Sequence, residues 1–339
     1  MPKPFWIALG LILLAIAGLS LSAGTAWREL NSPLNIAESG VLVDVPTGTS
    51  LSTFGEQLSQ RGMLDNPMLL TWYARLRGDA TRIQAGEYRL MPGATPVSLL
   101  SQLVGGRVYL HQLTIVEGWR FNELMAALRD HPAIQPAGLD AGQIMAALGS
   151  PGTHPEGQFF PDTYSFPRGT TDLELLGWAH EALGLTLSRA WADRTPDLQL
   201  EDAYQALILA SIVEKETALS NERERISGVF HRRLERGMRL QTDPTVIYGM
   251  RDNFDGNLRR RDLERDTLYK TYTRSGLPPT PIALAGQAAI LAAVKPAASD
   301  ALYFVATGEP DGSHQFSATL EEHNQAVRNY LQRTRERSR

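Results

Sequence analysis

The stretch Ala206-Leu-Ile-Leu-Ala-Ser-Ile-Val-Glu-Lys-Glu216 decides how the second half of the chain folds. Its apolar residues cover almost the whole circumference of a helix, so the helix must be buried inside a domain. The run then changes abruptly to the charged residues Glu214, Lys215 and Glu216. We therefore predict a buried helix over Leu200–Thr217 that delivers carboxylates at its C-terminal end.

A carboxylate at that end of a buried helix has an unusual environment. The negative end of the helix dipole and partial burial both disfavour ionisation, so both raise the pKa of a glutamate there. A raised pKa suits a general acid that protonates a glycosidic oxygen near neutral pH. Glu214 and Glu216 lie about 200° apart around the helix, so they cannot both face one cleft. One can enter a groove while the other meets solvent or an arginine, and periodicity alone does not choose between them.

A second helix follows closely. Asn221 with Glu224 has the spacing of a capping box and predicts a helix over Glu222–Arg236, which Gly237 ends. The buried helix must therefore stop close to Glu216.

The remainder of this half mixes loops with helices. Residues 237–286 are rich in loop-forming residues. Helical periodicity is present over Leu173–Ala192, in a helix that follows residue 286 and ends at about Val294, and over Leu320–Leu331. Ala301–Ala306 has the pattern of a strand. The six arginines in residues 223–239 alternate with glutamates, which predicts a solvated helix face. His323 is expected on an exposed face of the last helix.

The first half contains a smaller unit. It is predicted to contain a strand over Val41–Val45, helices over Leu51–Arg61 and Met68–Arg77, and a strand over Gly86–Leu90. This strand–helix–helix–strand order, entered through Pro46-Thr-Gly-Thr-Ser-Leu51, resembles a LysM-type carbohydrate module. A nonspecific α+β subdomain fits the pattern equally well, because no residue here identifies a sugar.

A bridging region joins the two halves. Its predicted elements are a helix over Pro96–Leu103, a strand over Leu113–Val116, and helices over Phe121–Leu128 and Ala141–Leu148. The aromatic segment Phe159–Phe166 could stack on sugar rings, although such clusters fill protein cores more often.

The N-terminus predicts a membrane anchor. Lys3 and Arg28 bracket 24 uncharged residues, Pro4–Trp27. A span of about 20 apolar residues crosses a bilayer as a helix. A cleaved signal peptide is the alternative, with small-residue cleavage points near Ala23 or Ala26.

Composition excludes several classes of protein. The net charge of -4 creates no field that attracts nucleic acid to the whole chain. The absence of cysteine excludes thiolate zinc sites, cysteine nucleophiles and disulfides. GxSxG, SxxK, HExxH and P-loop motifs are missing from the sequence, and the seven histidines do not have metal-ligand spacing. We expect neither a metal nor another cofactor.

Two motifs identify a family. Leu209-Ala-Ser-Ile-Val-Glu-Lys-Glu-Thr217, followed by Arg239-Leu-Gln-Thr-Asp-Pro-Thr-Val-Ile-Tyr-Gly249, resembles the endolytic murein transglycosylases of the MltG (YceG-like) family. Further matching motifs follow in family order at Tyr269–Tyr272, Gly276–Pro279, Pro281–Ala283, Leu302–Ala306 and Glu322–Asn324. The resemblance runs from the membrane segment to Tyr330. Lys270, where many members have Asn, and Leu284-Ala285, where Pro often precedes the glycine, depart from the family pattern.

The resemblance implies a fold and a division of the chain. We expect an α+β protein with an N-terminal transmembrane helix, a LysM-like α/β subdomain, and a mainly helical, lysozyme-like catalytic domain with a loop-rich C-terminal part. The expected divisions are a transmembrane anchor at 1–27, a linker at 28–40, a LysM-like subdomain at 41–105, a bridging region at 106–165 and a catalytic transglycosylase domain at 166–339.

The resemblance also implies the residues of the site. In the family the second glutamate of Glu-Lys-Glu is catalytic, which corresponds to Glu216, with Glu214 secondary. The substrate-binding residues are expected to be Gln241, Thr242, Asp243, Tyr248 and Tyr272. Their groups suit sugar hydroxyls and acetamides, although Asp243-Pro244 could be only a turn and Tyr248 only core.

The implied reaction cleaves the MurNAc–GlcNAc bond within nascent glycan strands and ends their elongation. Such an enzyme needs one carboxylate, because the C6 hydroxyl of N-acetylmuramic acid is the nucleophile and a 1,6-anhydro end forms. Expected partners are peptidoglycan glycan strands, the membrane and cell-wall synthases (penicillin-binding proteins), with no nucleic acid. The expected location is the inner membrane, single-pass, with the catalytic domain in the periplasm. A hydrolytic muramidase and a non-catalytic peptidoglycan-binding scaffold remain alternatives.

Overall fold

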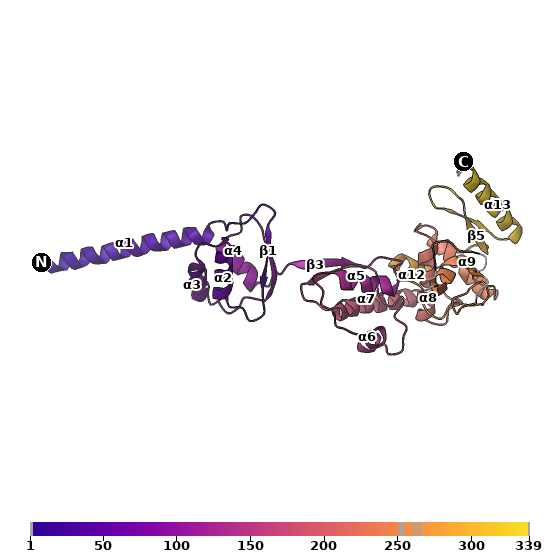
Figure 1. The fold of residues 1–339 in the computed structure, drawn as a ribbon, viewed down its shortest axis with the longest axis horizontal. Coiled ribbons are helices and arrows are strands. Elements are labelled where there is room, and N and C mark those ends of the chain that lie inside the picture. The colour runs from indigo at the N-terminus through magenta and orange to yellow at the C-terminus, as the bar shows by residue number, and fades with distance from the viewer. Residues whose placement is uncertain (1–2, 251–253, 260–261, 264–265, 338–339) are drawn as a thin grey trace. The chain divides into compact units, whose positions relative to one another are not determined.

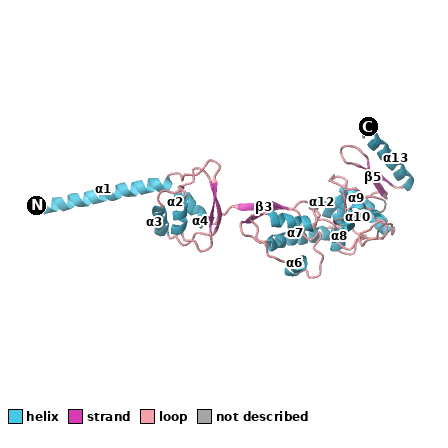
Figure 2. Ribbon diagram, viewed as in Figure 1, coloured by secondary structure: helices cyan, strands magenta, loops and turns pink. Residues whose placement is uncertain are grey.

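The structure is a computed structural model that describes residues 3–250, 254–259, 262–263 and 266–337. Small parts of the predicted anchor (1–2), of the loop-rich stretch (251–253, 260–261, 264–265) and of the C-terminus (338–339) therefore lie outside the described residues. The chain divides into two compact units, Met1–His111 with Ser165–Gly169, and Gln112–Tyr164 with Thr170–Arg339 (Figure 1). Helices and short two-stranded sheets make up both units, so the chain is an α+β protein (Figure 2).

The first unit has the element order expected from the sequence. Its elements are α1 (Lys3–Asn31), β1 (Val41–Val45), α2 (Leu51–Gln60), α3 (Pro67–Arg77), β2 (Gly86–Leu90) and α4 (Pro96–Val104). Side chains of Ser50 and Asn66 cap α2 and α3 by accepting from backbone N–H groups, which explains why both helices begin where they do. β1 and β2 pair antiparallel, with Val43 opposite Tyr88, and both residues are buried in the core of this unit.

The segment between α1 and β1 is part of this unit's structure. α1 continues to Asn31, past the predicted anchor. Leu30 and Leu34 are buried, and the Leu34 N–H donates to the carbonyl of Ala94 at 2.7 Å. The residues expected to form a linker thus fasten the end of α1 to the module.

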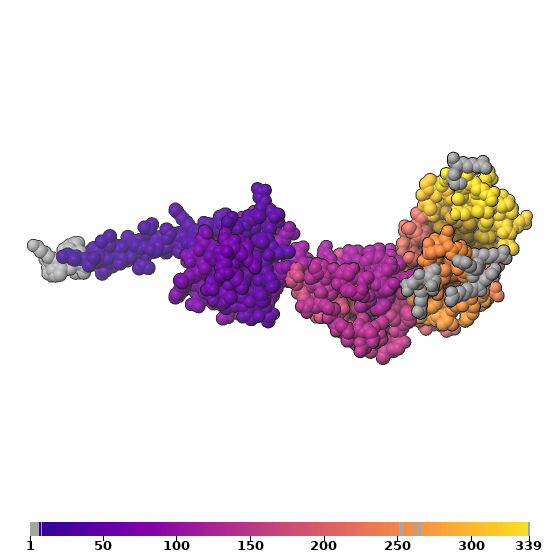
Figure 3. All heavy atoms as spheres, in the orientation of Figure 1, coloured from indigo at the N-terminus to yellow at the C-terminus, as the bar shows by residue number. Residues whose placement is uncertain are grey.

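α1 is the one helix among the described residues that is long and apolar enough to cross a membrane, over Leu9–Asn31. The apolar part of this span is not buried against protein, whereas Leu30, near its C-terminal end, is; α1 stands clear of the module over most of its length (Figure 3). Its side chains have no core of their own to pack into, which fits a single-pass membrane anchor.

A second small sheet was only partly expected. β3 (Leu110–Thr114) pairs with β4 (Thr163–Pro167). The strand was predicted at Leu113–Val116, so it begins and ends two to three residues earlier than expected. β4 was not predicted. Beside this sheet, the buried carboxylate of Glu87 in β2 accepts from His111 at 2.6 Å and from Arg168 at 3.0 Å.

The second unit is mainly helical. Its elements after β3 and β4 are α5 (Phe121–Asp130), α6 (Ala141–Ala147), α7 (Asp172–Ala192), α8 (Ala203–Glu216), α9 (Arg223–Glu235), α10 (Asp243–Met250), α12 (Gln287–Val294), β5 (Tyr303–Ala306), β6 (His314–Ser317) and α13 (Leu320–Arg337). α8 is its central helix: every residue from Ala206 to Val213 is buried, and α7, α9, α10 and α12 pack around it. The predicted buried helix is confirmed.

One local expectation is wrong, and two elements were not predicted. The N-cap of α9 is Glu222 rather than Asn221, and no capping box forms with Glu224. The Glu222 carboxylate instead accepts from the backbone N–H of His314 at 2.9 Å and contacts its Nδ1 at 2.7 Å, which fastens β6 to the start of α9. The helix α10 lies within the stretch expected to be loop, and β6, antiparallel to β5, was also missed.

The arginines near α9 were expected on a solvated helix face, but not all of them lie there. Arg223 and Arg233 are 9% and 7% exposed. Arg233 donates from Nε to the carbonyl of Leu302 and from Nη1 to that of Leu240, each at 2.7 Å. A buried guanidinium with backbone partners holds three chain segments together, so alternation with glutamates was a poor guide to exposure.

Candidate active site

Glu216 is the last residue of α8 and lies in the wall of a cavity of about 410 Å³. The cavity is lined by Glu216, Arg233, Leu240, Gln241, Asp243, Tyr272, Tyr303, Phe304, Val305, Leu320, His323 and Val327. These residues come from α8, α9, the segment that leads into and starts α10, the loop that contains Tyr272, β5 and α13, so the cavity forms only when elements distant in sequence come together. Its mixture of polar and apolar groups is typical of a ligand site.

The surroundings of Glu216 favour its protonated form. Burial disfavours the charged carboxylate and, with the negative charge of Asp243, raises the pKa of Glu216 to about 7. The Thr242 hydroxyl donates to Oε1, and this hydrogen bond and the Arg233 charge act in the opposite direction. Near neutral pH both forms of the Glu216 carboxyl group are therefore present in quantity, as a group that first donates and then accepts a proton requires.

Glu214 has a different environment from Glu216. Its side chain is 5% exposed, its Oε1 accepts from Arg223 at 2.9 Å, and its Oε2 accepts from the Gly286 N–H at 3.0 Å. It does not line the cavity that contains Glu216. The expectation that the two carboxylates face different ways is confirmed, and Glu214 is the one that pairs with an arginine.

The segment before α10 brings polar groups to the cavity. The N–H of Gln241 donates to the carbonyl of Thr271 at 3.1 Å, and that of Thr242 donates to the Thr271 hydroxyl at 3.0 Å. Gln241 has a φ of 51°, a left-handed conformation that is costly for a residue with a side chain. These contacts hold Gln241 in the strained conformation and place Thr242 against Glu216.

Asp243 and Tyr272 form a polar pair in the same cavity. The Tyr272 hydroxyl donates to Oδ1 of Asp243 at 2.7 Å. Burial, followed by this hydrogen bond and the negative charge of Asp243, raises the pKa of Tyr272, so the phenol stays protonated. The pair can present both a donor and an acceptor to a bound sugar.

The structure brings most of the predicted site residues together. One cavity is lined by Glu216, Gln241, Asp243 and Tyr272. Thr242 is buried, does not line the cavity, and donates a hydrogen bond to Glu216. Tyr248 does not line the cavity.

Tyr248 instead packs against other residues of the second unit. Its ring lies 4.7 Å from that of Tyr269, and the Arg120 guanidinium lies 5.4 Å from its centroid. Burial and the neighbouring Glu156 raise the pKa of Tyr248. Its expected part in substrate binding stays a prediction.

Three of the cavity residues that were not predicted from the sequence have polar groups: Arg233, Tyr303 and His323. His323, expected on an exposed face, stacks on Tyr303 with ring centroids 5.1 Å apart. Its buried Nδ1 has no hydrogen-bond partner among the described residues. Burial, aided by the charge of Arg233, lowers the pKa of His323, so the ring is neutral at pH 7.

A signal in the sequence could have placed His323 correctly. Leu320, His323 and Val327 occur at the i, i+3, i+7 spacing of one helix face, and all three line the cavity. That face of α13 packs toward β5, so His323 shares its position with apolar neighbours.

Comparisons with known proteins show which family the chain resembles. The sequence profile of the YceG-like family matches residues 43–329. The chain is 32% identical over 310 residues to the endolytic murein transglycosylase of Bacillus subtilis (strain 168), covering 86% of this chain and 85% of that protein. It is 26% identical over 331 residues to the endolytic murein transglycosylase of Streptococcus pneumoniae (serotype 2, strain D39), covering 86% of this chain but 58% of that protein.

A solved structure is also similar. The crystal structure of a yceG-like protein of Listeria monocytogenes, lmo1499, aligns with a TM-score of 0.51 and 28% sequence identity. The alignment covers 85% of this chain and 99% of that one.

Proposed function

The chain belongs to the YceG-like family, and we propose on that basis that it cuts peptidoglycan strands internally as a lytic transglycosylase, with Glu216 as its single acid and base. The observation that supports this assignment best is the position of Glu216. It lies at the end of the buried helix α8 and lines a cavity, where burial raises its pKa to about 7. A carboxyl group in such surroundings is half protonated near neutral pH and can serve in both directions.

The proposed reaction has two proton transfers. The Glu216 carboxylic acid protonates the oxygen of the MurNAc–GlcNAc bond as that bond breaks. The resulting Glu216 carboxylate then takes the proton of the C6 hydroxyl of the same N-acetylmuramic acid, whose oxygen bonds to C1. The products are a free GlcNAc hydroxyl and a 1,6-anhydro-MurNAc end, with no water consumed, and the strand elongates no further.

The polar residues of the cavity have supporting roles in this proposal. The Thr242 hydroxyl holds Glu216 by donating to Oε1. Gln241 and the Asp243–Tyr272 pair lie where they can hydrogen-bond to sugar hydroxyls and acetamides. The Tyr303–His323 stack supplies a flat face of the kind on which a sugar ring packs.

One observation favours a second candidate reaction. Asp243 is a carboxylate in the cavity of Glu216, and a glycosidase that adds water uses two carboxyl groups. Asp243 could in principle activate water, which would make the enzyme a hydrolytic muramidase. Its Oδ1 already accepts from Tyr272, and the intramolecular reaction has no need of a second base.

The test is to digest purified peptidoglycan with the full-length protein in detergent and to weigh the fragments. Transglycosylation gives 1,6-anhydro ends, which are lighter by one water than reducing ends formed by hydrolysis. Anhydro ends formed inside long strands are the expected result. Reducing ends would replace the proposal by hydrolysis, and intact sacculi after long incubation would replace it by a scaffold.

We propose further roles for the other parts of the chain. The first unit's strand–helix–helix–strand module acts as a LysM-like holder of glycan strands, and the second unit is a lysozyme-like catalytic domain. α1 anchors the chain in the inner membrane with the rest in the periplasm, where cell-wall synthases can meet it. Cell fractionation should find the full-length chain in the inner membrane; a soluble species beginning near Gly24 or Trp27 would contradict the anchor.

A further inference from the structure

The helix α3 has an apolar face that nothing in its own unit covers. Met68, Trp72 and Leu76 are 68%, 56% and 84% exposed, and their spacing of four residues puts them on one side of the helix. The opposite side, with Leu70 and Ala74, is buried in the core. A surface helix in water normally carries charged residues on its outer face, so this row is unusual.

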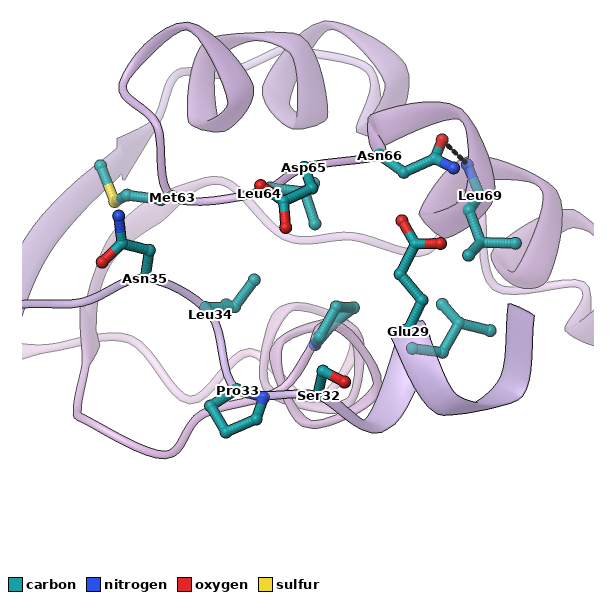
Figure 4. A pocket seen from close by; sticks show the side chains of 12 residues that line it. Glu29, Ser32, Pro33, Leu34, Asn35, Met63, Leu64, Asp65, Asn66 and Leu69 are labelled. Carbon is teal, nitrogen blue, oxygen red and sulfur yellow. Dashed lines mark hydrogen bonds between the residues drawn. The ribbon is translucent and has the colours of Figure 1, made fainter. Parts of the chain in front are cut away.

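This exposed row lies beside the end of α1. The ring of Tyr73 on α3 meets that of Trp27 on α1 edge-on, with centroids 6.5 Å apart. Figure 4 shows Glu29, from the last turn of α1, near Asn66 and Leu69 at the start of α3. In Figure 1 α3 lies at the end of the module from which α1 extends, whereas β1 lies at the other end.

The contact with Trp27 sets the level of α3 along α1. Trp27 is the last residue of the uncharged run, which Arg28 ends. A helix that touches Trp27 through Tyr73 is therefore level with the boundary between the apolar span and the water. The neighbouring Trp72 and Leu76, one residue before and three residues after Tyr73, cannot lie far from that boundary.

The side chains around the row have the chemistry of a membrane interface. Tryptophan and tyrosine are enriched where a chain meets lipid headgroups. The Arg75 guanidinium lies 5.8 Å from the ring centroid of Trp72, and that of Arg77 lies 5.6 Å from Tyr73. α3 contains no acidic residue, but Arg77 pairs with Asp79, just beyond the end of the helix, at 3.0 Å. Arg75 is therefore the arginine of this face that can meet a lipid phosphate.

We propose that the face of α3 formed by Met68, Trp72 and Leu76 inserts into the headgroup–acyl boundary of the leaflet in which α1 ends. The first unit then contacts the bilayer twice, through α1 and through α3, and lies against the membrane instead of swinging on a tether. The inference rests on the proposed anchor role of α1 and is independent of the catalytic assignment. An interfacial helix of this kind buries its apolar face by about 5–10 Å.

The absence of cysteine from the sequence makes a direct test possible. Single cysteines at Met68 and Leu76 carry nitroxide labels in the full-length chain, reconstituted into phosphatidylethanolamine–phosphatidylglycerol vesicles. Leu14→Cys, in α1, is the lipid control, and Leu42→Cys, at an apolar position of β1 that is 41% exposed, is the aqueous control. Collisions with oxygen report lipid, and collisions with a water-soluble nickel chelate report water.

Labels at 68 and 76 are expected to favour oxygen over nickel, as at 14, while the label at 42 favours nickel. Adding Leu76→Glu to Met68→Cys should return the label at 68 to water without changing the melting temperature, because position 76 is exposed. Nickel-accessible labels at 68 and 76 would overturn the proposal. Protection from both reagents would overturn it in favour of a protein or glycan partner, and a nickel-accessible label at 14 would overturn the anchor as well.

Discussion

At the scale of single residues, two glutamates of one helix have different surroundings. Glu214 pairs with Arg223; burial raises the pKa of the Glu214 carboxyl group, while the Gly286 N–H and the Arg223 charge act in the opposite direction. Glu216 faces the cavity, where burial and Asp243 hold a proton on it. Because the two side chains lie about 200° apart around the helix, one can pair with Arg223 while the other faces the cavity.

The first prediction concerns the pH dependence of cleavage. The first step needs protonated Glu216, so kcat/KM should fall as pH rises through about 7, approaching tenfold per unit above it. Asp243→Asn removes a negative charge that raises the pKa of Glu216, so the fall should occur at lower pH. Rates of anhydro-end release, measured from about pH 5 to about pH 9, give the pH profiles of both proteins. An unchanged midpoint in the variant would mean that Asp243 does not tune Glu216.

A second prediction concerns stability at the same residue. The pKa of Glu216 is raised from 4.5 to about 7 on folding, so the folded state binds the proton more tightly than the unfolded state. Its contribution is most favourable below pH 4.5 and is lost as pH rises through about 7. Glu216→Gln removes the charge and should raise the free energy of unfolding at alkaline pH by about 1–3 kcal/mol.

The control for that stability change is the same comparison at acid pH. Thermal melts of both proteins near the unfolded-state pKa should differ little, because Glu216 is largely protonated there. Equal differences at acid and alkaline pH would show that Glu216 is not buried in its charged form.

The direction of this pKa shift could be predicted from the sequence, but its local causes could not. An apolar run that ends in Glu-Lys-Glu indicates burial at a helix end. The Thr242 hydrogen bond and the charges of Asp243 and Arg233 act on Glu216 from segments far apart in the chain. No local pattern encodes such contacts.

At the scale of elements, the β5–β6 hairpin contributes β5 to the wall of the cavity and is held by two attachments near its turn. At the start of β6, Glu222, with a side chain 6% exposed, binds His314. In the turn, Glu309 pairs with Arg333 and Arg337, all well exposed. The two attachments differ in burial, so they should differ in strength.

The third prediction compares these two attachments. Glu222→Ala leaves a buried backbone N–H and a histidine unpaired and should lower the free energy of unfolding by about 3 kcal/mol, with a higher KM because the wall loosens. Glu309→Ala removes exposed ion pairs and should cost no more than about 1 kcal/mol. Denaturant melts and initial rates measure both variants. Equal losses would mean that Glu222 does not hold the hairpin.

Elements with clear local signals were predictable, and those without them were not. Ser50, Asn66 and the Thr95 capping box start α2, α3 and α4 where the sequence indicated. β4 and β6 are short strands whose positions depend on pairing with distant partners. The Asn221–Glu224 pattern failed because the neighbouring Glu222 has a tertiary partner, His314, that decides how the chain enters α9.

At the scale of the whole molecule, the sequence supported a membrane segment, an N-terminal module and a helical second half. The structure keeps that order but divides the chain into two compact units, and the first unit includes Ser165–Gly169 as well as Met1–His111. The chain returns to its first unit after Gln112–Tyr164 of the second, and such a return has no signature in the composition of the sequence. The finer divisions at 28–40, 41–105 and 106–165 stay predictions.

The fourth prediction tests the proposed glycan-holding role of the module. Deleting residues 41–105 should weaken binding to insoluble peptidoglycan much more than cleavage of short soluble glycans, because the Glu216 cavity lies in the second unit. Sedimentation with sacculi measures binding, and product release measures cleavage. Unchanged binding after the deletion would remove the carbohydrate-module assignment.

The most direct test of the account compares anhydro-end formation by Glu216→Gln and Glu214→Gln, with thermal melts showing that each variant is folded at the assay temperature. General acid–base catalysis contributes about 10²–10⁴-fold, so Glu216→Gln should lose at least that factor, whereas Glu214→Gln should lose less because it acts only through Arg223 and Gly286. Near-normal turnover by Glu216→Gln with a dead Glu214→Gln would mean that the wrong glutamate was assigned. Activity in both variants would contradict a single-carboxylate site at the end of α8.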